Sequence, residues 1–145
     1  CTPVSYCSAG TTSNGCNAHL TATGSASASA GSGFVLSASG VEGAATGLIF
    51  YGLNGANSAP WGAGSSYLCL RYPVERTGNQ NSGGTAGACN GSYALDFNTW
   101  LSTHPSALGR PFAAITTAWA QAWFRDPPAP KSTSLSDAVR FEICP

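Results

Sequence analysis

The chain has 145 residues, a length that normally forms one domain with a sizeable core, and six acidic residues balance six basic ones. Charged residues make up 8% of the chain, against about 25% in a typical globular domain, and this composition argues against a nucleic-acid partner. The sequence has neither a polybasic segment nor an apolar run near the roughly 20 residues of a transmembrane helix, which argues against membrane insertion. We therefore expect one domain that spans residues 1–145.

Seven segments between clusters of Gly, Asn, Ser and Pro have the apolar pattern of β-strands. Residues 47–53 form a continuous apolar run, which predicts a buried central strand. In 138–143, apolar Val139, Phe141 and Ile143 alternate with charged residues, which predicts one buried and one exposed face. The predicted strands span residues 18–24, 31–39, 47–53, 67–72, 92–98, 112–126 and 138–143.

One segment has a helical rather than a strand pattern. Residues 98–109 begin with Asn98, carry the apolar Trp100 and Leu101 and end with Gly109, which predicts one short helix. Short strands separated by turn residues are typical of an antiparallel sandwich or jelly roll. We therefore predict an all-β fold, an antiparallel β-sandwich with jelly-roll character and one short helix near 98–109.

The cysteines and the missing methionine indicate the compartment. Because the chain contains no methionine, Cys1 is not the initiator residue, and we expect an exported and processed protein. An even number of cysteines in such a chain predicts three disulfides, whereas a metal site is disfavoured because no CxxC pair occurs and His19 and His104 stand alone. A lipid on Cys1 is the alternative, but it would leave an odd number of cysteines. The six are Cys1, Cys7, Cys16, Cys69, Cys89 and Cys144.

The sequence lacks the motifs that carry the common catalytic reactions. It has no GxSxG, GxxxxGK[ST], GxGxxG or HExxH pattern, and the acidic residues do not cluster as in a calcium loop. Asp126 and Asp137 lie near Arg125 and Arg140 in the sequence, so we expect ion pairs that hold the 125–137 loop. We predict no catalytic residues, no metal and no cofactor.

Three tryptophans are candidates for a binding or packing surface. Trp119 and Trp123 fall on one face of the predicted 112–126 strand, together with Ile115, Thr117 and Gln121. Burial in the core is the simpler interpretation, because an aromatic side chain dominates a sandwich core. The alternative is a platform that stacks sugar rings or a neighbouring subunit, and Trp61, in a Gly-rich loop, is the better exposed candidate for that role.

Several strings together resemble a cysteine-containing β-sandwich module at the C-terminus of large secreted bacterial proteins, where it often follows FG-GAP-type repeats. The strings cover nearly the whole chain in order, and the resemblance implies a secreted location and a sandwich fold but no catalytic activity. It also implies that Cys7 pairs with Cys16, Cys69 with Cys89, and Cys1 with Cys144. The matching strings are YCSAGTTSNGC (6–16), GLIFYG (47–52), LCLRYPVERT (68–77), NSGGTAGACNGSYALDFN (81–98), WAQAWFRDP (119–127) and LSDAVRFEICP (135–145).

The expected function is that of a structural subunit of an extracellular bacterial assembly, such as a filament, sheath or surface layer. A neutral chain has little self-repulsion, and head-to-tail contacts that do not close a ring produce fibres, so we expect a homopolymer or contacts with other cell-surface proteins. One alternative is a secreted glycan-binding or adhesive module. Another is a C-terminal sorting domain that is cut from a larger exported protein.

Overall fold

The computed structural model describes residues 1–113 and 115–145. In this part of the chain it contains eleven strands and one short helix, and the predicted all-β class is confirmed. The elements are β1 (Val4–Tyr6), β2 (His19–Gly24), β3 (Phe34–Val41), β4 (Thr46–Gly52), β5 (Ala56–Pro60), β6 (Tyr67–Leu70), β7 (Val74–Arg76), β8 (Gln80–Asn81), β9 (Gly91–Asp96), α1 (Phe97–Thr103), β10 (Thr116–Arg125) and β11 (Thr133–Ile143).

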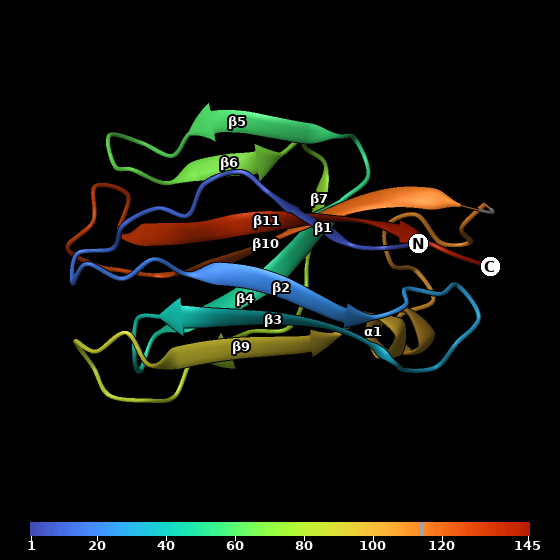
Figure 1. The fold of residues 1–145 in the computed structure, drawn as a ribbon, viewed down its shortest axis with the longest axis horizontal. Helices are drawn as coiled ribbons and strands as arrows, with labels where there is room; N and C mark the ends of the chain where they lie inside the picture. The colour runs from blue at the N-terminus through green and yellow to red at the C-terminus, as the bar shows by residue number, and fades with distance from the viewer. Residues whose placement is uncertain (114) are drawn as a thin grey trace.

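The described strands form three layers (Figure 1). The large sheet has the order β1-β11-β10-β4-β7, and β8 pairs with the other end of β4. The small sheet has the order β2-β3-β9, and the hairpin consists of β5 and β6. All of these strand pairs are antiparallel. In Figure 1 the large sheet lies between the hairpin and the small sheet, so the predicted sandwich has a third, partial layer.

The main core lies between the large and the small sheet. Phe34 of β3, Phe97 of α1 and Phe141 of β11 are buried there, and the Phe141 ring centroid lies 4.8 Å from that of Phe34 and 5.1 Å from that of Phe97. The central strand β10 contributes small buried side chains to this core. Because alanines project little from the sheet, the aromatic rings of the facing layer fit against them at close-packed density. These buried β10 residues are Ala118, Ala120 and Ala122.

The strand predictions hold best where the apolar pattern is strong. The predicted buried strand at 47–53 is β4, which lies between β10 and β7 in the large sheet. Val139, Phe141 and Ile143 are buried as predicted. The predicted 112–126 strand is too long, because β10 begins at Thr116. Ala114 lies outside the described residues. Ile115 does not share the tryptophan face, since it precedes the strand with a φ of 57° and a side chain that is 62% exposed.

Four short strands had no sequence prediction. They are β1, β5, β7 and β8, and none of them falls within a predicted strand. Their residues are mostly exposed or half-buried, so they carry little apolar alternation. Each forms because a neighbouring strand supplies backbone hydrogen-bonding partners, and that neighbour is β11 for β1, β6 for β5 and β4 for β7 and β8.

The helix is shorter than predicted and begins earlier. Asp96, not Asn98, is the N-cap residue, and its carboxylate accepts a hydrogen bond from the Thr99 backbone N–H at 3.1 Å. The helix ends at Thr103, since Pro105 disfavours helical geometry at the residue before it. Asn98 is fully buried and its amide bonds the backbone of the loop between β2 and β3, which attaches the helix to that loop.

Candidate binding surface

The outer face of the large sheet, away from the main core, carries the tryptophans of β10. Strand alternation directs Trp119, Gln121 and Trp123 to this face, opposite the buried alanines, as the sequence predicts. Trp119 and Trp123 are half-buried, because they pack against a second apolar cluster between the large sheet and the hairpin. That cluster is built on the buried residues Leu48, Phe50, Leu68, Leu70 and Leu135.

Trp61 follows β5 and packs against the same cluster, so it is half-buried rather than freely exposed. Its indole N–H donates a hydrogen bond to the Thr133 hydroxyl at 2.8 Å. The ammonium of Lys131 lies 3.9 Å from the centroid of its ring, within the range of a cation–π contact. Both contacts hold the indole against the start of β11, so Trp61 attaches the hairpin to the large sheet.

An open groove lies beside Trp123 on the outer face of the large sheet, and we call it the Trp123 groove. It has a volume of about 550 Å³ and its walls come from β4, from β7 and the residues after it, and from β10. The guanidinium of Arg76 lies 5.7 Å from the centroid of the Trp123 ring. The groove therefore combines an aromatic wall with cationic and neutral polar groups, and its lining includes Thr46, Leu48, Arg76, Asn79, Trp123 and Arg125.

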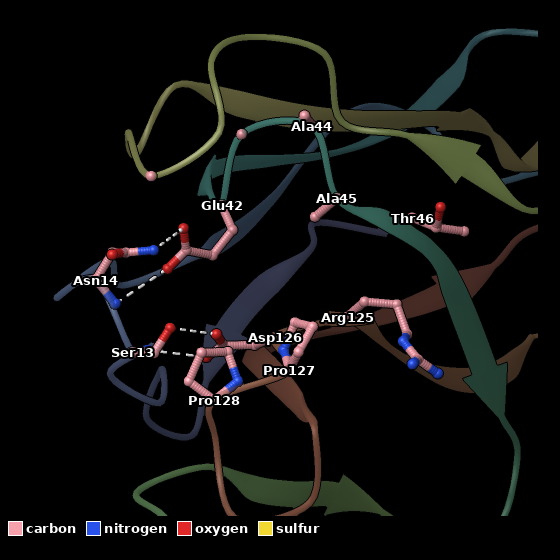
Figure 2. Close-up of a pocket in the computed structure, with 12 residues that line it drawn as sticks. Ser13, Asn14, Glu42, Ala44, Ala45, Thr46, Arg125, Asp126, Pro127 and Pro128 are labelled. Atoms are coloured by element: carbon pink, nitrogen blue, oxygen red, sulfur yellow. Dashed lines mark hydrogen bonds between the residues drawn. The ribbon is translucent and has the colours of Figure 1, made fainter.

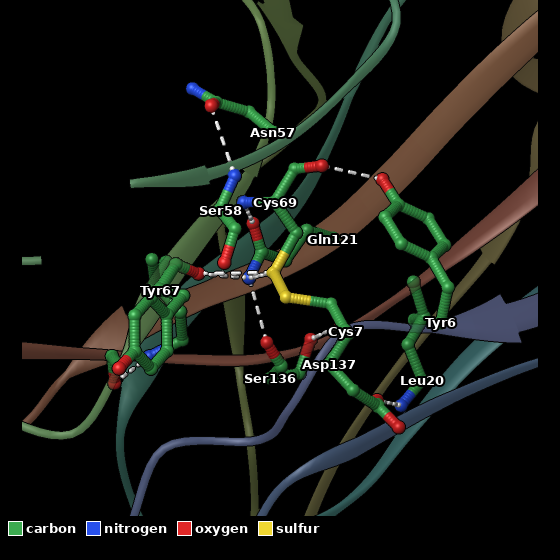
Figure 3. Close-up of a disulfide and its surroundings, with 12 residues drawn as sticks. Tyr6, Cys7, Leu20, Asn57, Ser58, Tyr67, Cys69, Gln121, Ser136 and Asp137 are labelled. Atoms are coloured by element: carbon green, nitrogen blue, oxygen red, sulfur yellow. Dashed lines mark hydrogen bonds between the residues drawn. A yellow bond between two sulfur atoms is a disulfide. The ribbon is translucent and has the colours of Figure 1, made fainter. Parts of the chain in front are cut away.

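Gln121 connects the large sheet to the hairpin from a fully buried position (Figure 3). Its amide oxygen accepts a hydrogen bond from the Cys69 N–H at 3.0 Å. Its amide nitrogen donates to the Tyr67 carbonyl at 2.8 Å and to the Ser136 carbonyl at 2.7 Å. Because the buried Gln121 amide makes each of these hydrogen bonds, it specifies the position of β6 over β10.

The disulfide between Cys7 and Cys69 lies beside this amide (Figure 3). The segment after β1 is thereby joined to β6, and the Tyr6 hydroxyl adds a hydrogen bond to the Cys69 carbonyl at 2.6 Å. Burial raises the pKa of Tyr6 well above its usual value, so this hydroxyl remains a donor. The hairpin is therefore held by a covalent bond, two buried polar groups and the second apolar cluster.

The predicted disulfide pairing is wrong for two of the three bonds. All six cysteines are paired, and Cys1–Cys144 forms as expected. Cys7 pairs with Cys69, and Cys16 pairs with Cys89, so neither of the predicted Cys7–Cys16 and Cys69–Cys89 bonds exists. Each observed bond connects segments that are more than 60 residues apart in the sequence. The separations are 143, 62 and 73 residues.

Two buried carboxylates hold residues 12–14, which we call the clamp loop (Figure 2). Glu42 accepts hydrogen bonds from the Thr12 hydroxyl at 2.5 Å and from the backbone and amide N–H groups of Asn14 at 3.2 and 3.0 Å. Asp126 accepts from the Ser13 N–H at 2.9 Å and from the hydroxyls of Ser13 and Ser134 at 2.5 and 3.0 Å. In Figure 2 the Glu42 carboxylate lies beside Asn14 and the Asp126 carboxylate lies beside Ser13.

A cavity of about 450 Å³ lies next to the clamp loop, and Glu42, Asp126 and Arg125 are among its lining residues. Its carboxylates already accept several hydrogen bonds from the protein, so they serve the loop rather than a ligand. The sequence did not indicate this clamp. Asp126 and Ser13 are separated by 113 residues, and no local pattern relates them.

The predicted ion pairs of the 125–137 loop do not form. Asp126 binds the clamp loop instead of an arginine, and Arg125 is exposed at the Trp123 groove. Asp137 accepts a hydrogen bond from the Leu20 N–H at 2.6 Å, and its other oxygen lies 3.1 Å from His19 Nδ1. Arg140 pairs with Glu142, two residues along β11, at 3.4 Å.

The two histidines occupy separate structural positions. His19 lies beside Asp137, whereas the ring of His104 stacks on that of Trp100 at a centroid separation of 3.4 Å. Within residues 1–113 and 115–145, no group of three or more His, Cys, Asp or Glu side chains is placed to hold a metal ion. The one helix in this part of the chain is not long and apolar enough to cross a membrane.

Comparison with known proteins gives no match to a family model, to a curated protein or to a solved structure. The class of this protein is therefore defined only by its fold and by the outer face of its large sheet. The chain is an all-β, sandwich-like domain with three disulfides, which are typical of an oxidising environment outside the cytoplasm. Its candidate binding surface consists of Trp61, Trp119, Trp123 and the Trp123 groove.

Proposed function

We propose that this protein is a secreted, non-catalytic structural subunit of an extracellular bacterial assembly, such as a filament, sheath or surface layer, and that it associates with copies of itself. The observation that carries the proposal is the outer face of the small sheet. This face is built largely from small, uncharged side chains that alternate with the buried core residues of β2, β3 and β9.

The register of the small sheet places these side chains in rows. Thr21 of β2 lies beside Ser37 of β3, which lies beside Ala94 of β9. Thr23 lies beside Val35 in the next row. Small side chains allow another sheet to approach closely. The Thr21–Ser37–Ala94 row carries no charge that would repel another copy, whereas the next row ends at Asp96, which pairs with Val35.

The disulfides support the same proposal. Cys1–Cys144 joins the two ends of the described chain, Cys7–Cys69 holds the hairpin, and Cys16–Cys89 joins the clamp-loop region to the segment before β9. A chain of this length can form a core without such bonds. Covalent bonds at three separate places in the fold suit a subunit that bears load or proteolytic attack outside the cell.

The test is the association state of the purified, oxidised protein. We expect sedimentation velocity to show larger species as concentration rises, and electron micrographs of native material to show a polymer. A Ser37→Glu variant should remain monomeric, because it places a charge at the centre of the small-sheet face. Ser102→Glu, at an exposed position of α1, is the matched control and should associate like the wild type. A wild-type protein that stays monomeric at high concentration, without polymer on native cells, would refute the proposal.

A glycan-binding role is the second candidate, and the Trp123 groove favours it. Indole rings provide flat apolar walls against which the faces of sugar rings pack. The groove lies on the outer face of the large sheet, on the other side of the molecule from the small-sheet face. A subunit could therefore bind a glycan and a neighbouring copy at the same time.

A further inference from the structure

The acidic side chains of this protein are bonded within the molecule, whereas most of the basic side chains are exposed. All six carboxylate side chains take part in hydrogen bonds or ion pairs within the protein, and none is in a fully exposed position: Glu42, Glu75, Asp96, Asp126, Asp137 and Glu142. Four of the six basic side chains are exposed: Arg71, Arg76, Arg125 and Lys131. The formal net charge is zero, yet four cations are exposed while every carboxylate side chain is at least half-buried.

Two of the exposed cations converge on the Trp123 groove. Arg76 of β7 pairs with Phe50 across the sheet, and Trp123 of β10 pairs with Leu48, two residues earlier on β4. Paired residues share a face, and Arg125 shares the face of Trp123 because it is two residues further along the strand. The arginines therefore lie on strands that flank β4, on the same outer face.

Neither arginine has an acidic partner among residues 1–113 and 115–145. Among the described residues, the ion pairs are His19–Asp137 and Arg140–Glu142. Arg76 is held near the Trp123 ring by a cation–π contact, with its guanidinium 5.7 Å from the ring centroid. A guanidinium without an acidic partner has N–H donors that are free to bind a ligand. Their planar, forked arrangement matches the geometry of a carboxylate or a sulfate.

We propose that the Trp123 groove binds an acidic polysaccharide. Arg76 and Arg125 bind the carboxylate or sulfate groups of the sugar chain, and Trp123 packs against the apolar face of a sugar ring. The groove has a volume of about 550 Å³, which is within the usual range of about 300–1,000 Å³ for small-ligand sites. The open shape of the groove suits a segment of a longer sugar chain. This proposal specifies the ligand of the glycan-binding candidate and is independent of self-association.

Charge complementarity disfavours the other occupants. A second copy of this chain has no fully exposed carboxylate side chain in its described residues with which to pair the arginines. Nucleic-acid-binding domains neutralise many phosphates with a broad basic surface and are typically strongly basic, whereas this chain has an isoelectric point near 6.9. An acidic polysaccharide with spaced anionic groups matches two arginines beside an aromatic wall.

Isothermal titration of the whole oxidised protein with three probes tests the proposal. The probes are polygalacturonate, which carries carboxylates, dextran sulfate, which carries sulfates, and neutral dextran. We expect binding to at least one acidic probe and none to neutral dextran, and the acidic probe that binds identifies the anion. Binding should weaken as salt is added, because salt screens the exposed arginines. Absence of binding to both acidic probes overturns the proposal.

Two double variants of equal charge locate the site. Arg76→Gln with Arg125→Gln should weaken binding at least about tenfold, because it removes both charge-assisted contacts. Arg71→Gln with Lys131→Gln removes two exposed cations outside the groove lining and should change binding less than about twofold. All four positions are exposed, so both variants should keep the wild-type circular dichroism spectrum. Equal losses in the two variants would overturn the proposal, since they would indicate attraction by overall charge.

Two further results would contradict the proposal that the Trp123 groove binds an acidic polysaccharide. Tighter binding to a single-stranded DNA of the same charge, lost in the groove variant, would assign the groove to nucleic acid. Loss of oligomers in the groove variant, with no effect on polysaccharide, would assign it to a second copy. The failure of polysaccharide binding leaves the small-sheet proposal intact, because Ser37→Glu tests that face separately.

Discussion

Asp126 is 2% exposed, and the two oxygens of its carboxylate accept three hydrogen bonds from Ser13 and Ser134. An Asp126→Ala variant leaves the buried Ser134 hydroxyl without its acceptor, whereas the Ser13 donors are at an exposed residue and can turn to water. An unsatisfied buried group costs about 1–3 kcal/mol, so we expect the free energy of unfolding to fall by an amount in this range. Urea denaturation of the oxidised protein measures this change.

The matched control is Glu142→Gln, which removes a carboxylate from the half-exposed pair with Arg140. An exposed ion pair contributes about 0–1 kcal/mol, so this variant should unfold at nearly the same urea concentration as the wild type. A similar, small effect of both substitutions would contradict the structural role that we assign to Asp126. Clamp-loop contacts would then be unimportant for stability.

The buried environment of Tyr93 predicts how the free energy of unfolding changes at alkaline pH. Its hydroxyl donates to the Ala45 carbonyl at 2.6 Å, and burial raises the pKa of Tyr93 to about 12. Because the pKa is raised, folding favours the neutral phenol, and this stabilisation is complete below the unfolded value of about 10. It is lost as the pH rises through about 12. The difference in phenolate absorbance between wild type and Tyr93→Phe should titrate at about 12, and a midpoint near 10 would contradict this environment.

At the scale of the element, Asp96 connects the end of β9 to the start of α1. Its two oxygens accept from the Thr99 N–H at 3.1 Å and the Gly33 N–H at 2.8 Å. Burial alone raises the pKa of Asp96, but these and further backbone hydrogen bonds outweigh it and lower the pKa below the usual value. Asp96→Ala should therefore lower the free energy of unfolding by about 1 kcal/mol at neutral pH.

The sign of the Asp96 effect with pH follows from its lowered pKa. The stabilisation is present above the unfolded pKa, near 4, and is lost as the pH falls through the lowered folded pKa. The difference between wild type and Asp96→Ala should thus disappear in acid. Asp96→Asn keeps the capping acceptor and should lose less stability at neutral pH. Urea denaturation at several pH values provides the comparison.

Prediction from the sequence was accurate for elements with local periodicity. The alternation of β10 separated Trp119 and Trp123 from the alanine face, and the apolar run of β4 indicated a central strand. Trp61 lies in a loop as predicted, but it is half-buried rather than exposed, because it packs on the second apolar cluster and bonds Thr133, which is 72 residues away in the sequence. The arginines of the Trp123 groove had no local signal, since their grouping depends on the order β10-β4-β7.

At the scale of the whole molecule, the disulfides set the tolerance to unfolding. In the chain-entropy model, Cys1–Cys144 closes a loop of 143 residues, for which the stabilisation is about 5 kcal/mol. A Cys1→Ser, Cys144→Ser double variant should therefore fold but unfold at a distinctly lower urea concentration. The Cys7–Cys69 bond closes a shorter loop, of 62 residues, and a Cys7→Ser, Cys69→Ser variant that lacks it should also loosen the hairpin around Gln121.

Peptide mapping without reduction tests the pairing directly. We expect fragments that link Cys1 with Cys144, Cys7 with Cys69, and Cys16 with Cys89. A fragment that contains Cys7 bonded to Cys16 would contradict the position of the hairpin over the large sheet.

The sequence by itself determined the features that depend on composition and on neighbours in the chain. These are the all-β class, the buried and exposed faces of the longer strands, the involvement of every cysteine in a disulfide, and the sparse charge. The tertiary structure decided which cysteines pair, where each carboxylate finds its donors and which cations remain exposed. Such partners are as far apart as Ser13 and Asp126, 113 residues in the sequence, and only the path of the whole chain brings them within hydrogen-bonding distance. For that reason a formally neutral sequence folds into a molecule in which the carboxylate side chains are bound within the chain while four cations remain exposed.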